Sequence, residues 1–144
     1  MSATTDALAG ATDAENAAIF TYGMITAFVS AARRGTVAEY AAAHRSARDA
    51  VNAAITAAGS TPPDMSPGYT LPTDVTDSIG AAKVALAAEN DCATAYRVIL
   101  ERADTESARR LAVEQLTACA GRAATWRAAL RQSPVTVAFP GTPA

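Results

Sequence analysis

Two glutamates stand in the middle of rows of apolar residues. Alternating steps of three and four through residues 79–100 place Glu89 on one row, and the same count through residues 8–29 places Glu15 on a second row. A carboxylate buried alone is costly, so it must be protonated, paired with a cation or bound to a metal ion. Which of these three solutions the protein uses decides what chemistry it can do.

Nitrogen bases on two further stretches are candidates to balance these acids. Counted in the same way, His44 and Arg48 fall on the row of residues 37–58, and Arg122 flanks the row of residues 112–130. An arginine is always charged, offers a planar fork to carboxylates and repels a metal dication. We therefore expect a buried salt-bridge network in place of a metal ion. Its expected members are Glu15, His44, Arg48, Asp49, Glu89 and Arg122. His44 is expected to be a core histidine that is hydrogen-bonded to a neighbouring helix.

Four helices are expected to position these residues, because alanine supplies much of the apolar half of the sequence and aromatic residues only 6%. Gly35 is expected to end the first helix, and a capping box from Thr36 to Glu39 to open the second. Asp104 or Thr105 is expected to cap the fourth. The expected helices are about 5–33, 36–58, 75–103 and 105–131 in a single domain of residues 1–144.

A proline-rich segment separates the two halves of the chain. Prolines 62, 63, 67 and 72 prevent any helix from persisting through residues 59–73. Fully extended, this segment reaches on the order of 45 Å, whereas the second helix is about 35 Å long. The sequence thus predicts an all-α four-helix bundle made of two antiparallel hairpins joined by a long crossover. The tail, residues 132–144, is expected to be extended along the bundle with Phe139 as its anchor.

Several motifs resemble an uncharacterised actinobacterial family within the ferritin-like superfamily. They are AENAAIFTYG (14–23), AAHRSARDAV (42–51), SPGY (66–69), AAEND (87–91) and AFPG (138–141). In iron-binding members of the superfamily, helices one and three each supply a glutamate, and helices two and four each supply Glu-x-x-His. Glu15 and Glu89 match this pattern, but Ala41 stands three residues before His44, and the fourth helix contains no histidine. The resemblance therefore implies a ferritin-like bundle that cannot assemble the complete di-iron site.

The leading functional hypothesis is a non-catalytic structural or protein-interaction module without a cofactor. We expect a homodimer, because Phe20, Met24 and Phe28 form a second apolar row on the first helix; the alternative is that this row is additional core. The alternative is an oxidoreductase with iron or manganese at an incomplete site of Glu15, Glu89, His44 and Asp49. A small apolar ligand held between helices is a third possibility.

Net charge and hydropathy limit which partners and which cellular compartment can be expected. A net charge of −2 gives no global field to attract nucleic acid or anionic lipid, and no apolar run reaches the ~20 residues that span a bilayer. No secretory signal is evident at residues 1–6, so the cytoplasm is expected. Cys92 and Cys119 are expected at similar heights on the second hairpin, where they could touch, either as buried reduced thiols or as a redox pair.

Overall fold

Four helices and two long irregular segments make up the protein. The computed structural model describes residues 2–143, and these residues contain no β-strand. No helix within them is both long enough and apolar enough to cross a bilayer. The helices are α1 (Ala3–Ile25), α2 (Ala31–Ala57), α3 (Ser78–Arg102) and α4 (Glu106–Ala129). The all-α four-helix fold expected from the sequence is confirmed.

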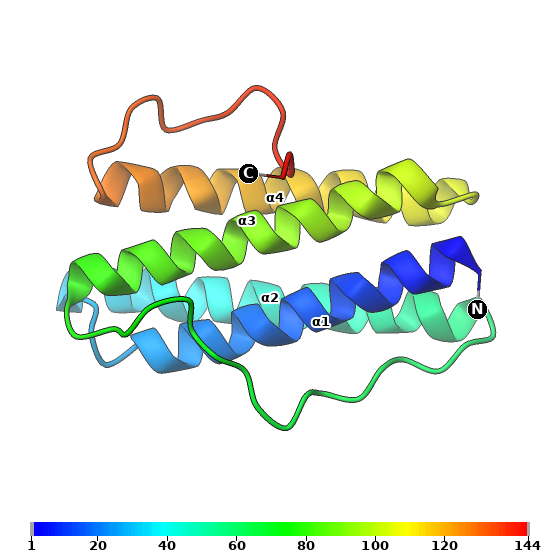
Figure 1. Cartoon of the computed structure of the whole chain (residues 1–144), viewed down its shortest axis with the longest axis horizontal. Coiled ribbons are helices and arrows are strands. Elements are labelled where there is room, and N and C mark those ends of the chain that lie inside the picture. Colours follow the sequence, from blue (N-terminus) through cyan, green and yellow to red (C-terminus); the bar gives the residue numbers. More distant parts are fainter. Residues whose placement is uncertain (1, 144) are drawn as a thin grey trace.

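The helices form two hairpins that pack against each other through α1 and α3 (Figure 1). The crossover between Ala57 and Ser78 starts beside the first turn of α1 and runs the length of the bundle to its other end. Consequently α3 begins where α1 ends, and the two helices run antiparallel. Pairs of residues far apart in the sequence are thereby brought to the same height in the core.

The boundary between α1 and α2 differs from the sequence-based expectation. α1 ends at Ile25 rather than near residue 33, and the short turn that follows buries Val29, whose exposed fraction is only 5%. α2 then starts directly after Ser30, whose extended backbone forms the N-cap. The predicted glycine stop at Gly35 and the capping box that follows it are therefore wrong, because both lie inside α2.

The second hairpin also departs from expectation at its first turn. α3 begins at Ser78 because the Asp77 carboxylate accepts a hydrogen bond of 2.7 Å from the Gly80 amide. Ile79, expected on the buried row, is 59% exposed at this first turn. Thr105 caps α4 by accepting from the Ala108 amide at 3.3 Å.

The core consists of two apolar clusters with a polar layer between them. One cluster includes Leu8, Ile55 and Ile99, and the other includes Ile25 and Trp126. On α1 the last residue of the first cluster is Ala18, and the first residue of the second cluster is Tyr22. On α2 the second cluster contains Val37 and the first cluster contains Val51, so most of residues 38–50 lie between the two clusters. The middle of the bundle is where the buried charged side chains gather.

The C-terminal tail arches over the second hairpin instead of lying extended along it (Figure 1). Phe139 is 75% exposed, so the expectation that it anchors the tail is wrong. Gly141 is the residue that approaches the bundle closely, since a Cβ added there would lie 2.6 Å from the Ala93 carbonyl oxygen. Its φ of +80° also favours glycine, and the neighbouring Thr142 hydroxyl accepts from Arg97 at 2.8 Å.

Candidate functional site

His44 of α2 lies at the centre of the polar layer. Its Nδ1 is 2.5 Å from Glu15 Oε2 on α1, and its Nε2 is 2.7 Å from Glu89 Oε2 on α3. All three side chains are fully buried. Because a carboxylate only accepts hydrogen bonds, both ring nitrogens donate and the ring is an imidazolium.

The environment of His44 favours this charged form. Burial alone lowers the pKa of His44, but the hydrogen bonds and charges of Glu15 and Glu89 outweigh burial and raise the pKa to about 9. Burial likewise tends to raise the pKa of Glu89, yet the nearby His44 and Arg122 lower it overall. The histidine and its glutamate partner are therefore both charged at neutral pH.

Arg122 of α4 supplies the second positive charge. Its Nε donates to Glu89 Oε1 at 2.8 Å, and its Nη2 donates to Cys119 Sγ at 3.4 Å. Burial tends to lower the pKa of Arg122, but the Glu89 carboxylate raises it overall. Two glutamates, one imidazolium and one guanidinium make this group electrically neutral. We call Glu15, His44, Glu89 and Arg122 the charge cluster.

Two tyrosines complete the hydrogen bonding of the charge cluster. Tyr22 on α1 donates to Glu89 Oε2 at 2.5 Å, and Tyr96 on α3 donates to Glu15 Oε1 at 2.7 Å. Trp126 Nε1 in turn donates to the Tyr22 hydroxyl at 2.8 Å. Burial, reinforced by these carboxylates, raises the pKa of both phenols. Both tyrosines therefore remain neutral donors, and all four carboxylate oxygens accept at least one hydrogen bond.

Four of the six residues expected in the network meet in the charge cluster, and Arg48 and Asp49 do not. Arg48 Nη2 lies 3.0 Å from Asp49 Oδ1 in a pair whose Asp49 side chain is 69% exposed. The expectation that Arg48 balances the buried glutamates is therefore wrong, and Asp49 is likewise too remote to be a ligand beside them. The cause is the early start of α2, which makes His44 the middle of the helix and leaves Arg48 one turn beyond it.

The sequence analysis did not identify Tyr22, Tyr96 and Trp126 as hydrogen-bonding partners around the charge cluster. A signal was present, since each tyrosine follows a buried glutamate by seven residues on its own helix. In an antiparallel pair of helices, that shared spacing places each tyrosine beside the glutamate of the other helix. The hydrogen bonds at both ends of the cluster follow from this register.

The residues present do not fit the pair of metal ions that iron-binding ferritin-like proteins hold. α4 places the Arg122 guanidinium in the layer, where the metal-binding pattern needs an acid and a histidine. The single histidine already uses both ring nitrogens. A smaller donor set remains, because ligand atoms of Glu15, His44 and Cys92 lie within 4.8 Å of one another. Binding one ion there would require removal of the proton that His44 shares with Glu15.

Two solved structures have a similar fold. A conserved hypothetical protein, Rv2844, from Mycobacterium tuberculosis is 36% identical, with a TM-score of 0.85 over 88% of this chain and 96% of its own. A ferritin-like, diiron-carboxylate protein from Bacillus anthracis str. Ames is 17% identical, with a TM-score of 0.69 over 89% of this chain and 93% of its own. The second likeness shows the fold alone.

The sequence comparisons define the family. No curated protein matches the chain. The model of a domain of unknown function, DUF4439, matches residues 7–144 and so includes every member of the charge cluster. The chain therefore belongs to the DUF4439 family, and its fold is the ferritin-like four-helix bundle.

Proposed function

We propose that this protein is a ferritin-like bundle in which paired side-chain charges, in place of a dimetal centre, hold the helices together. We propose further that it serves as a non-catalytic structural or protein-interaction module. The neutrality of the charge cluster carries the proposal. His44 and Arg122 balance Glu15 and Glu89, and the surrounding phenols donate to the remaining oxygens. A core satisfied in this way needs no dication to hold its helices together.

Metal analysis is the direct test. We expect protein purified without chelator to carry far less than one iron or manganese ion per chain, and calorimetric titration with Fe(II) or Mn(II) to give no saturable binding. The comparison variant is Arg122→Gln, which removes a positive charge beside Glu89 and should bind a dication more readily than the wild type. Stoichiometric metal in the wild-type core would overturn the proposal.

One observation favours a second candidate, an iron- or manganese-dependent oxidoreductase with an incomplete site. It is the proximity of ligand atoms from Glu15, His44 and Cys92, all of which are buried. Metal bound by these residues would be lost in His44→Asn and retained in Arg48→Ala, because Arg48 lies outside the charge cluster. The same titration therefore separates the two candidate functions.

The surface that supports the interaction role lies where α1 meets the crossover. Met24 and Phe28 are 47% and 37% exposed, and they border a hollow of about 610 Å³. Phe20, from the same apolar row, is partly covered by the crossover, with its ring centroid 6.0 Å from that of Tyr69. We propose that a second copy of the chain covers the open end of this row, because half-exposed Met and aromatic side chains are enriched at interfaces.

Sedimentation velocity tests the proposed homodimer. The wild type is expected to sediment as a dimer and Met24→Lys as a monomer, because a buried unpaired ammonium opposes association. Val113→Lys is the matched control, since Val113 is 52% exposed on α4, away from the hollow. A monomeric wild type at high concentration would remove the dimer from the proposal.

We propose a cytoplasmic location and an actinobacterial family, without nucleic acid or membrane as partner. Cys92 and Cys119 are free thiols, as is typical of proteins in a reducing compartment. The net charge of −2 supports the absence of a polyanionic partner. The Mycobacterium tuberculosis relative supports the actinobacterial assignment. Fractionation of the native host, followed by immunodetection, tests the location.

A further inference from the structure

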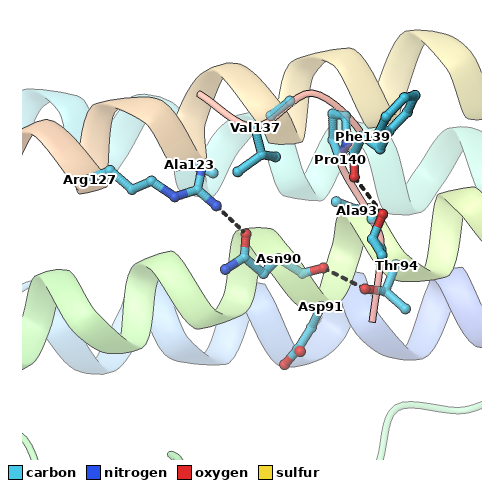
Figure 2. A pocket seen from close by; sticks show the side chains of 12 residues that line it. Asn90, Asp91, Ala93, Thr94, Ala123, Arg127, Val137, Phe139 and Pro140 are labelled. Atoms are coloured by element: carbon cyan, nitrogen blue, oxygen red, sulfur yellow. Dashed lines mark hydrogen bonds between the residues drawn. The ribbon is translucent and has the colours of Figure 1, made fainter. Parts of the chain in front are cut away.

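Residues 137–142 of the C-terminal tail enclose a hollow against α3 and α4 (Figure 2). We call it the tail hollow. It has a volume of about 270 Å³, and both the helices and the tail contribute to its lining. That volume lies just below the roughly 300–1,000 Å³ of sites for drug-sized molecules. The tail hollow is therefore of a size to hold a small organic molecule between the tail and the helices.

Three contacts fix the tail over this hollow. Arg127 Nη1 donates to the Val135 carbonyl oxygen at 3.2 Å, and Arg97 Nη1 donates to the Thr142 hydroxyl at 2.8 Å. Between these two points Gly141 lies so close to α3 that only a residue without a Cβ fits. The tail is thus an ordered wall of the hollow.

Arg127 brings a positive charge to the tail hollow. Its Nη2 donates to Asn90 Oδ1 at 3.2 Å, and with the bond to Val135 this accounts for two of the five N–H donors of the guanidinium. Both acceptors are neutral, and none of the ion pairs formed within residues 2–143 includes Arg127. An anionic group in the hollow would therefore meet an arginine that still has donors to bind it.

Apolar side chains flank this charge. Val137 and Phe139 of the tail are 48% and 75% exposed, and they line the hollow together with Pro140. On the opposite side the helices contribute Ala93 and Ala123, which form a floor of small side chains. A ligand that covers this surface gains free energy by removing apolar area from water.

Asp91 is the one acid in the lining of the hollow, and its carboxylate is turned away from the tail. Figure 2 shows this carboxylate on the side of α3 that lies away from residues 137–142. Asp91 also borders a smaller cavity of about 60 Å³ beside the crossover, where Tyr69 and Pro72 are among its neighbours. Near the tail, the hollow thus presents positive charge at Arg127 and apolar surface around it.

We propose that the tail hollow binds a small organic anion, a monocarboxylate with an aromatic or branched apolar body. The carboxylate accepts hydrogen bonds from the remaining N–H groups of Arg127, and the apolar body covers Val137 and Phe139 against the alanine floor. The tail, held by Arg97 and seated at Gly141, closes over the ligand. This site is separate from the charge cluster and from the hollow between α1 and the crossover, so it goes beyond the interaction role.

NMR titration of ¹⁵N-labelled protein with sodium benzoate, at constant ionic strength, tests the proposal. Benzoate is expected to give saturable shifts of the backbone amides of residues 90–94, 120–127 and 137–142. Benzamide has a similar shape without the charge, and acetate has the charge without the apolar body, so both should bind several-fold more weakly. Saturable shifts confined to other residues, or none at millimolar benzoate, would overturn the site.

Two arginine variants test the recognition of the carboxylate. Arg127→Gln should weaken benzoate binding about tenfold or more and remove the preference for benzoate over benzamide. Arg109→Gln is the matched control, because Arg109 is an exposed arginine of α4 that donates to the Ala103 carbonyl oxygen outside the hollow. Circular dichroism verifies that both variants are folded. Equal benzoate affinity in the two variants would show that Arg127 does not bind the carboxylate, and the proposal would be wrong.

Two further variants test the part of the tail. Phe139→Ala removes an exposed ring and should weaken the binding of benzoate and benzamide alike. Gly141→Ala, which forces the tail off Ala93, should weaken both ligands relative to Gly68→Ala, where an added Cβ meets nothing within 4 Å. Wild-type affinity in both Phe139→Ala and Gly141→Ala would exclude the tail from the site and so contradict a ligand enclosed beneath it.

Discussion

Tyr22 on α1 donates a hydrogen bond of 2.5 Å to Glu89 on α3. The relationship is reciprocal, because Tyr96 on α3 donates to Glu15 on α1 at 2.7 Å. His44 lies between the two glutamates and hydrogen-bonds to both. The two hairpins are thus joined by a continuous chain of polar contacts. Its donors and acceptors are satisfied only when α1, α2 and α3 are in register.

Removing one phenolic oxygen should measurably weaken the polar contacts that join the two hairpins. Tyr22→Phe and Tyr96→Phe should each lower the free energy of unfolding by about 1.5–3 kcal/mol, because each deletes a hydrogen bond to a buried carboxylate. Tyr22→Phe should cost more, since it also strands the Trp126 indole N–H. The matched control is Tyr40→Phe, which removes a bond between neutral groups, Tyr40 to Thr125, and should cost about 0.5–1.5 kcal/mol. Urea unfolding measures all three, and equal losses would contradict a special role for the cluster phenols.

The imidazolium of His44 should make stability fall in mild alkali. Its pKa is raised to about 9 in the folded protein, compared with 6.5 when unfolded. A raised pKa stabilises the fold fully below the unfolded value, and that contribution is lost as the pH rises through the folded value. The wild type should therefore lose on the order of 3 kcal/mol between pH 6.5 and pH 9.5, as followed by urea unfolding at each pH.

A histidine variant isolates this pH effect from other titrations in the same range. His44→Gln keeps a polar side chain but cannot titrate, so it should be less stable than wild type at pH 6.5 and nearly flat up to pH 9. Because His44 is the only histidine, its ring resonances also report the pKa directly by NMR. A ring that titrates near 6.5 in the folded protein would show that the two glutamates do not hold it charged.

The fold was predictable because its signals are local and repeated. Alanine-rich helical rows and a proline-rich segment long enough to span the bundle leave few topologies other than two hairpins and a crossover. The ends of α1 and α2 were not predictable in this way. Gly35 is a strong stop signal, but the buried Val29 and the cap residue Ser30 determine the turn, and both act through packing and backbone geometry that the sequence alone does not show.

The charge cluster was predictable in part for the same reason. Isolated acids on apolar rows identified Glu15 and Glu89, and charge accounting then pointed to basic partners. The exclusion of Arg48 depends on helix ends, since His44 and Arg48 lie one turn apart on α2 and only the residue at mid-height can reach both glutamates. A boundary error of five residues at the start of α2 was enough to include Arg48 among the expected members.

Variants of Arg122 and Arg48 test the finding that Arg122 pairs with the buried Glu89 and Arg48 does not. Arg122→Ala leaves Glu89 with an uncompensated buried charge, so it should lower the free energy of unfolding by about 3–5 kcal/mol. Arg48→Ala removes only an exposed pair and should change stability by less than about 1 kcal/mol. Chemical denaturation of both variants at pH 7 decides the matter. A large loss in Arg48→Ala, with Arg122→Ala close to wild type, would reverse the assignment.

Gly35 and Gly59 test where α2 begins and ends. Gly35 lies inside α2 at an exposed position where an added Cβ meets nothing within 4 Å, so Gly35→Ala should stabilise the protein by about 1 kcal/mol through helix propensity. Gly59, just after the helix, has a φ of +81°, so Gly59→Ala should destabilise by about 1–2 kcal/mol, because an L-residue is strained there. Thermal unfolding followed by circular dichroism distinguishes the two signs. If Gly35→Ala were as destabilising as Gly59→Ala, residue 35 would be a left-handed helix stop, and the early start of α2 that places His44 between the glutamates would be incorrect.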